Sequence, residues 1–207
     1  MPSTPLRPPG AEPVGRFLSL CTHCGQCAEA CPFSSIVLEA GLNPLESGTP
    51  KVIPKRMPCW LCMRCGLACP TGALAPVEKT KAGMGTAVID RKRCFTYIGS
   101  IICRTCFEKC PLKARAITLE LALYPVITKE CVGCGVCENV CPAQCIDTLP
   151  PGSAITPEEP VDPSQLDKKA AWGPEFAPAK VALAESAAKS RPERHGILGT
   201  IGKVFFG

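Results

Sequence analysis

The stretch that decides the fold is CTHCGQCAEACP at residues 21–32, which places four cysteines within eleven positions and follows them with a proline. Nearly the same string returns three more times. The four groups hold sixteen of the 17 cysteines: Cys21, Cys24, Cys27 and Cys31; Cys59, Cys62, Cys65 and Cys69; Cys94, Cys103, Cys106 and Cys110; and Cys131, Cys134, Cys137 and Cys141. Their first cysteines stand 38, 35 and 37 residues apart, so the chain contains an internal repeat of nearly constant period.

The spacing C-x2-C-x2-C-x3-C-P is the ligand pattern of a bacterial [4Fe–4S] cluster. In ferredoxins with two clusters, the first three cysteines bind one cluster and the fourth binds the neighbouring one. A proline after the fourth cysteine lacks an N–H and fixes φ, so the chain turns away from the cluster there. The prolines at this position are Pro32, Pro70, Pro111 and Pro142. The spacing therefore predicts that the sixteen grouped cysteines bind four [4Fe–4S] clusters.

The composition favours a fold held together by bonds between cysteines and a metal cluster. Aromatic residues make up only 5% of the 207 residues, and Trp60 and Trp172 are the only tryptophans. A core so poor in large apolar side chains buries too little surface to offset the entropy of the chain. Disulfides fit poorly, because the number of cysteines is odd and no secretory signal is visible. Structural zinc fits poorly as well, because it favours two separated cysteine pairs.

Two cysteines leave questions open. In the third group, eight residues (FTYIGSII) separate Cys94 from Cys103. Either this longer loop still brings Cys94 to its cluster, which the similar approach sequences TAVIDRKRC and PVITKEC favour, or the site lacks one ligand and holds a three-iron or labile cluster. Cys145 falls outside all four groups, and we predict a non-ligand that packs as a small buried hydrophobe. The alternative is a spare thiol able to replace Cys141.

Short apolar stretches flank the groups and predict strands. They precede groups two, three and four (KVIP, TAVID, PVIT) and follow all four (SIVLEAG, GALAPV, AITLELAL, CIDTL). Each repeat therefore reads as a strand, a cysteine loop, a short helical turn and a strand. We expect an α+β fold of tandem bacterial-ferredoxin-like modules, each with two clusters. The groups could pair sequentially, one with two and three with four, or in a nested way, two with three and one with four.

The expected domains are a proline-rich N-terminal lead (1–16), a tandem cluster region (17–150) and a flexible proline- and alanine-rich tail (151–207). The end of the tail, GILGTIGKVFFG, is apolar but too short to span a bilayer, and no run of 18 apolar residues occurs elsewhere.

The net charge of +5 arises within residues 1–150, which hold 16 basic and 11 acidic residues. Four clusters at about −2 each would offset it. No aromatic residues interleave with the basic ones, so nucleic acid is not an expected partner.

With the groups in place, the chain resembles the NapG/MauM ferredoxin-type family from residue 6 to about 150. The resemblance rests on LRPPGA before the first group, FLSLCTHCGQCAEACP, PCWLCMRCGLACPTGAL, MGTAVIDRKRC, the expanded third group ending CPLKARAITLE, and CVGCGVCENVCP. It implies an electron carrier with four [4Fe–4S] clusters. Its implied partners are a membrane-bound, quinol-oxidising iron–sulfur donor and a periplasmic reductase or dehydrogenase. The tail after residue 150 lies outside the shared pattern.

The resemblance also implies a periplasmic location, because members normally carry a twin-arginine signal. Here Met1 falls just before the RPPGA lead-in, so we expect either a truncated start or a cytoplasmic member. No substrate site is expected, since His23 and His195 are the only histidines and no catalytic pattern is present. The alternatives are an electron-transfer subunit of a molybdopterin oxidoreductase and, less favoured, a zinc-binding interaction module.

Overall fold

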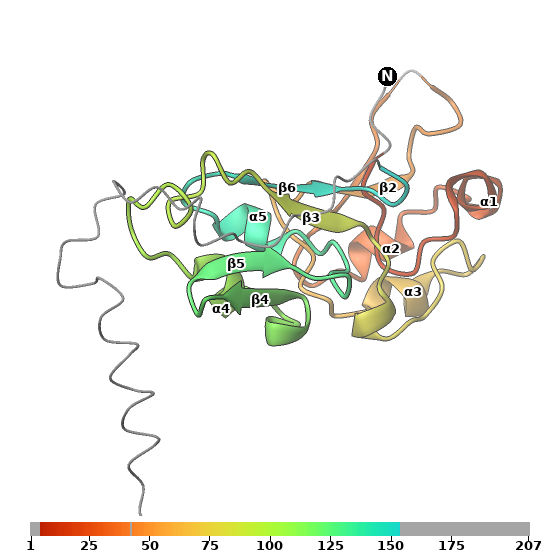
Figure 1. Ribbon diagram of the computed structural model, residues 1–207. Helices are drawn as coiled ribbons and strands as arrows, with labels where there is room; N and C mark the ends of the chain where they lie inside the picture. Colours follow the sequence, from red (N-terminus) through yellow and green to blue (C-terminus); the bar gives the residue numbers. More distant parts are fainter. Residues whose placement is uncertain (1–4, 42, 154–207) are drawn as a thin grey trace, which may run out of the picture. The chain divides into compact units, whose positions relative to one another are not determined.

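The computed structural model describes residues 5–41 and 43–153 (Figure 1). Its elements are all short. In chain order they are α1 (Val14–Leu20), α2 (Gln26–Glu29), β1 (Ile36–Leu38), β2 (Pro50–Val52), α3 (Arg64–Ala68), η1 (Lys79–Lys81), β3 (Thr86–Ile89), α4 (Thr105–Lys109), η2 (Lys113–Arg115), β4 (Ile117–Glu120), β5 (Tyr124–Ile127), α5 (Val136–Val140) and β6 (Ile146–Leu149). The mixture of helix and strand agrees with the predicted α+β class. The predicted tail lies outside the described residues beyond position 153.

Residues 84–149, which we call module 2, carry groups three and four. The hairpin β4–β5 lies between the two groups, with Ile117 opposite Ile127. Strand β3, before group three, pairs antiparallel with β6, after group four, so that Ile89 faces Ile146. The two pairs are visible together in Figure 1. All four strands predicted around these groups are therefore present.

Residues 5–78, which we call module 1, carry groups one and two and have less sheet. The hairpin β1–β2 lies between the groups, with Ile36 opposite Val52. The predicted strand GALAPV is wrong: among the described residues it forms only a single bridge, between Leu74 and Ala11. Pro76 cuts the segment short, because it has no N–H to donate to a ladder.

The N-terminal lead takes the place of the missing outer strands. Ala75 donates its backbone N–H to the carbonyl of Gly10 (2.7 Å), and Glu12 donates to Ala73 (3.1 Å). Gly10 has φ +72°, and a Cβ there would lie 2.1 Å from the Ala75 oxygen, so only glycine fits. The chain then enters helix α1, which starts after Pro13 and buries Phe17 completely. This helix leads into group one where a strand leads into the others.

Arg7 anchors the lead to the hairpin of module 1. Its side chain is only 6% exposed. Nη1 donates to Thr49 Oγ1 at 2.7 Å and to the Pro50 carbonyl at 3.0 Å, and the guanidinium carbon lies 4.8 Å from the centre of the Phe17 ring. The backbone of Val52 also donates to the Leu6 carbonyl (2.8 Å). The lead is therefore part of the packed interior of module 1.

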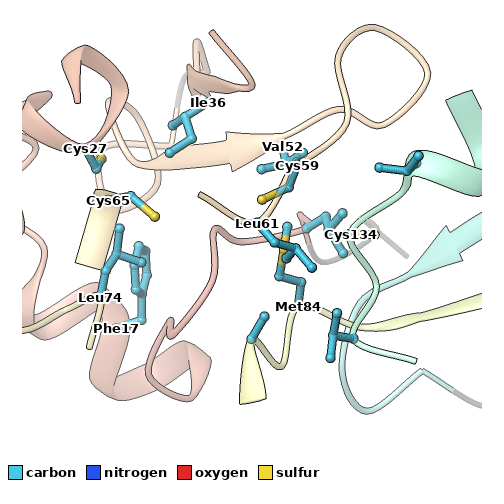
Figure 2. Close-up of a cluster of buried hydrophobic side chains, with 14 of the residues drawn as sticks. Phe17, Cys27, Ile36, Val52, Cys59, Leu61, Cys65, Leu74, Met84 and Cys134 are labelled. Carbon is cyan, nitrogen blue, oxygen red and sulfur yellow. The ribbon is translucent and has the colours of Figure 1, made fainter. Parts of the chain in front are cut away.

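Thiols occupy much of that interior. Two groups of buried apolar residues form the core, and cysteines make up four of the fifteen residues in one and five of the ten in the other. Figure 2 shows Cys27 beside Cys65, and Cys59 and Leu61 close to Cys134 and Met84. Phe17 is the only aromatic residue among the largest fully buried side chains of the described part. The core thus needs whatever the thiols bind in order to be cohesive.

The two modules meet through hydrogen bonds and a close packing contact near the cysteines. Cys59 donates its N–H to the carbonyl of Cys134 at 2.9 Å. Asn139 Nδ2 donates to the Pro54 carbonyl at 3.0 Å. Gly135 packs so closely on Pro54 that a Cβ would lie 2.5 Å from that ring. These bonds join the second group directly to the fourth.

Candidate metal centres

A cavity beside α1 shows how the first two groups combine. Three thiols of group one line it together with one thiol of group two, namely Cys21, Cys24, Cys27 and Cys69. The rest of the lining includes the apolar side chains of Phe17, Ala73 and Leu74. This is the arrangement of three thiols plus a fourth from the neighbouring group that two-cluster ferredoxins use.

Module 2 has two such cavities. One is lined by the first three thiols of group three and the fourth of group four: Cys94, Cys103, Cys106 and Cys141. The other is lined by the fourth thiol of group three and the first three of group four: Cys110, Cys131, Cys134 and Cys137. Each group therefore contributes its fourth cysteine to the other.

The remaining four thiols follow the same rule in module 1. Burial is the main cause that raises the pKa of Cys65, and the charges of Cys62 and Cys31 raise it further, so the fourth cysteine of group one lies near group two. Ser35 fixes this approach, because its N–H donates to Cys31 Sγ (3.4 Å) while its hydroxyl donates to the carbonyl of Pro58 (2.6 Å).

We call the four sets of thiols cradles. Cradle 1 comprises Cys21, Cys24, Cys27 and Cys69; cradle 2 comprises Cys31, Cys59, Cys62 and Cys65; cradle 3 comprises Cys94, Cys103, Cys106 and Cys141; and cradle 4 comprises Cys110, Cys131, Cys134 and Cys137. The thiols thus assemble by sequential pairing, one with two and three with four. The nested arrangement does not occur.

Hydrogen bonds reach the sulfur atoms of several thiols. Leu74 donates its N–H to Cys69 Sγ at 3.4 Å, and the Thr71 hydroxyl lies 3.7 Å from the same sulfur. Burial raises the pKa of Cys69, but these hydrogen bonds outweigh it, and the pKa is lowered overall. In cradle 3, the Thr105 hydroxyl lies 3.5 Å from Cys103 Sγ. Such bonds stabilise a thiolate and orient it.

Other thiols are held against ionisation. Burial is the main cause that raises the pKa of five cysteines, to about 12 for Cys59 and Cys106 and to about 11 for Cys27, Cys65 and Cys134. Burial likewise raises the pKa of Cys137. A thiol of this kind becomes a ligand only when a bound cation compensates its charge, so metal loading of the cradles releases protons.

The donor sets fit a [4Fe–4S] cluster. Each cradle offers four sulfurs in the expected division of three and one, and apolar side chains line the cavities of cradles 1, 3 and 4. All 17 cysteines are free thiols. No three Cys, His, Asp or Glu side chains in the described part of the chain are placed to bind a single metal ion together. The thiols instead surround spaces that separate them.

Hydrogen bonds within the expanded third group hold the loop between Cys94 and Cys103 in place. Thr96, which is fully buried, accepts the backbone N–H of Cys103 at its hydroxyl oxygen and donates that hydroxyl to the Cys103 carbonyl, both at 3.0 Å. Tyr97 donates its hydroxyl to the Pro125 carbonyl at 3.1 Å and packs on Tyr124. The eight residues between Cys94 and Cys103 therefore form a fixed loop that returns Cys103 to Cys94, and the structure brings both to cradle 3.

Sequence reasoning missed three features of these centres. It gave no role to Arg7 or Thr96, since neither belongs to a ligand motif. It treated Cys145 as a buried hydrophobe; the residue is indeed only 2% exposed, but it also lines the cavity of cradle 3. Aligning the repeats on their fourth cysteine would have signalled this position, which holds Ser35 in group one and Ala73 in group two.

The described residues include one of the two histidines and can be searched for helices that would span a membrane. His23 lines the cavity of cradle 1 and is exposed, whereas His195 lies outside the described residues. Among the helices of the described part, none is both long and apolar enough to cross a bilayer.

Family comparisons agree with a cluster-binding chain. The 4Fe-4S dicluster domain family matches residues 20–73 and 58–114, and the 4Fe-4S binding domain family matches residues 124–147. The first match corresponds to groups one and two, but the second runs from group two into group three. The spacing alone therefore allows either neighbour as the partner of group two, and the pairing comes from the fold.

Curated relatives show the same type of protein. The chain is 39% identical over 149 residues to the methylamine utilization ferredoxin-type protein MauM of Paracoccus denitrificans, covering 66% of each chain. It is 39% identical over 152 residues to the ferredoxin-type protein NapG of Escherichia coli, covering 66% of this chain and 65% of that protein. It is 31% identical over 147 residues to the ferredoxin-type protein NapF of Escherichia coli, covering 70% and 84%. The match thus spans slightly less than two thirds of the MauM and NapG relatives named.

Proposed function

The chain belongs to the ferredoxin-type family of MauM and NapG, an iron–sulfur electron-transfer family, and from this we propose that it carries four [4Fe–4S] clusters, one in each cradle. The relatives are named as ferredoxin-type proteins and not as catalytic enzymes, in agreement with the prediction that the chain has no substrate site. The observation that carries the proposal is the exchange of fourth cysteines, which gives every cradle four sulfurs.

Each bound cluster would supply one-electron redox chemistry. Contacts between neighbouring cradles determine the spatial order in which the four cradles follow one another. Helices α2 and α3 pack together and place Cys27 close enough for the charge of Cys65 to raise its pKa. In module 2, α4 packs on α5 and brings Cys106 near Cys137, where the charge of Cys106 adds to the effect of burial in raising the pKa of Cys137. The hydrogen bond between Cys59 and Cys134 joins cradle 2 to cradle 4. These contacts support the order 1, 2, 4, 3.

We propose redox partners at the two ends of this order, cradle 1 and cradle 3. The proposed donor is a membrane-bound, quinol-oxidising iron–sulfur protein, the proposed acceptor is a reductase or dehydrogenase, and the proposed location is periplasmic, as the family resemblance implies. The electron-transfer subunit of a molybdopterin oxidoreductase is the competing proposal. A large catalytic subunit that co-purifies in stoichiometric amounts with the anaerobically isolated protein would decide for that alternative.

Iron analysis of paired variants tests both the number of clusters and their ligands. The anaerobically purified chain should contain about sixteen irons and as many inorganic sulfides. Replacing Cys24 and Cys69 by alanine removes two ligands of cradle 1 and should leave about twelve irons. Replacing Cys62 and Cys69, which belong to the same group but to different cradles, should leave about eight.

The nested pairing predicts a loss of two clusters from both variants, so equal iron contents would contradict the proposal. The matched control is Cys145→Ala, which should retain about sixteen irons. A colourless protein with zinc and no sulfide would overturn the cluster assignment altogether.

A further inference from the structure

Cradle 3 contains a fifth thiol that the proposed function does not use. Cys145 lines the same cavity as Cys94 and Cys141, and its sulfur lies 3.5 Å from Cys141 Sγ. Its backbone carbonyl accepts the N–H of Asp90 at 2.7 Å, at the point where β6 begins to pair with β3. The sheet therefore holds the backbone of Cys145 in place, and the 2% exposure of the residue shows that water does not compete for its thiol.

Groups one and two satisfy their fourth cysteine differently. Ser35, at the matching position of group one, offers its backbone N–H to Cys31, while its hydroxyl points to Pro58. Group two has Ala73 there, and the next residue, Leu74, donates its N–H to Cys69. In these two groups the backbone donates to the sulfur. Only in group four does the side chain at this position reach the sulfur of the fourth cysteine.

We propose that Cys145 is a positioning residue that donates an S–H···S hydrogen bond to the Cys141 thiolate and thereby raises the reduction potential of the cluster in cradle 3. This inference rests on the proposed function. The direction of the bond follows from ligation: a cysteine bound to iron has lost its proton, so only Cys145 can donate.

The effect on the potential follows from charge. One-electron reduction makes a cluster and its thiolates more negative, so a donor to sulfur stabilises the reduced form more than the oxidised form. S–H is a weak donor, but the low dielectric of a buried site strengthens its interaction with a charge. We expect removal of the bond to lower the equilibrium constant for reduction about three- to tenfold, which corresponds to about 30 to 60 mV.

The test is a redox titration of the whole, loaded protein, followed by electron paramagnetic resonance. The signal of cradle 3 is identified by its disappearance in Cys103→Ala. Cys145→Ala should lower the potential of that signal alone, with about sixteen irons retained. Cys145→Ser keeps a donor and should stay within about threefold of the native equilibrium constant. Ile146→Val is the packing control, because Ile146 is equally buried and lines the same cavity without a polar group.

Several results would overturn the inference. An unchanged potential in Cys145→Ala would show that the contact has no electrostatic effect, and an equal drop in the serine or Ile146 variant would show that packing is the cause. Loss of about four irons from Cys145→Ala would make Cys145 a ligand or an essential support. Failure of the proposed function is distinguishable, because the native protein itself would then lack sixteen irons.

Discussion

Modules 1 and 2 provide the same sulfur ligands with different amounts of regular structure. Module 2 has two antiparallel strand pairs, one between its cysteine groups and one that joins its ends. Among its described residues module 1 has only the inner pair, β1–β2, and closes its ends with the bridge between Ala11 and Leu74 and the buried side chain of Arg7. Both modules nevertheless exchange their fourth cysteines in the same way. The comparison indicates that the exchanged thiols, more than the sheets, define each module.

Removal of the metal is expected to have the largest effect on this comparison. Oxidation and chelation of the iron should abolish most protection against hydrogen exchange in both modules. Without metal the buried thiols form no bonds to iron, and the apolar core is too small to offset the entropy of the chain. If the loss is followed stepwise by mass spectrometry, peptides covering β1–β2 should exchange before those covering β4–β5, because module 1 has fewer strand pairs. Simultaneous exchange, or the opposite order, would show that the extra sheet of module 2 does not stabilise it.

The next largest effect is expected at Arg7 in module 1. Arg7→Met removes two buried hydrogen bonds from a charged donor and should lower the stability by about 2 kcal/mol. The rate at which guanidinium releases the clusters should rise by up to about thirtyfold, with faster hydrogen exchange in module 1 only.

Arg16→Met is the control for this prediction. Arg16 is exposed, and its ion pair with Glu12 (3.3 Å) lies at the surface, so its loss should matter little. Equal effects of the two substitutions would mean that the anchor of the lead is not what closes module 1.

A smaller effect is expected at the loop that only module 2 contains. Thr96→Val preserves the shape of the side chain but leaves the N–H and carbonyl of Cys103 without their partner, at a cost of about 1 to 2 kcal/mol. The cradle 3 signal should therefore disappear first during exposure to oxygen, and Thr96→Ser should restore the native order of loss. If the valine variant loses cradle 1 first, the loop does not support its cradle.

The smallest effect is expected where the modules meet. Lys55 Nζ lies 2.8 Å from Asp147 Oδ1, and both side chains are more than half exposed, so Lys55→Met should change the stability by only about 0.5 kcal/mol. The hydrogen bond and charge of Asp147 raise the pKa of Lys55 above its ordinary value of 10.5.

A raised pKa of a basic group means that the folded state binds the proton more tightly. The contribution is therefore complete below pH 10.5 and is lost as the pH rises through the higher value of the folded state. The difference in cluster-release rate between the native protein and Lys55→Met should shrink both at such high pH and in high salt. A difference that persists in concentrated salt would point to packing instead of charge.

The cysteine groups and most strands could be predicted from the sequence, because cysteine spacing and apolar alternation are local patterns. Pairing could not, since groups two and three are as close in sequence as groups one and two. The apolar residues of GALAPV favour a strand, but Pro76 has no N–H to donate to a ladder. Arg7 and Thr96 act through partners 42 and 7 residues away, which no spacing rule identifies.

The exchange of fourth cysteines has a consequence for how the protein is made. During synthesis Cys24 emerges from the ribosome 45 residues before Cys69. The first three thiols of cradle 1 therefore lack their fourth partner until the second group has been made. A solitary motif, copied or deleted by recombination, would leave two sites deficient. A pair of cysteine groups is consequently the smallest unit that can be gained or lost with all cradles complete, so a longer protein of this type contains an even number of groups.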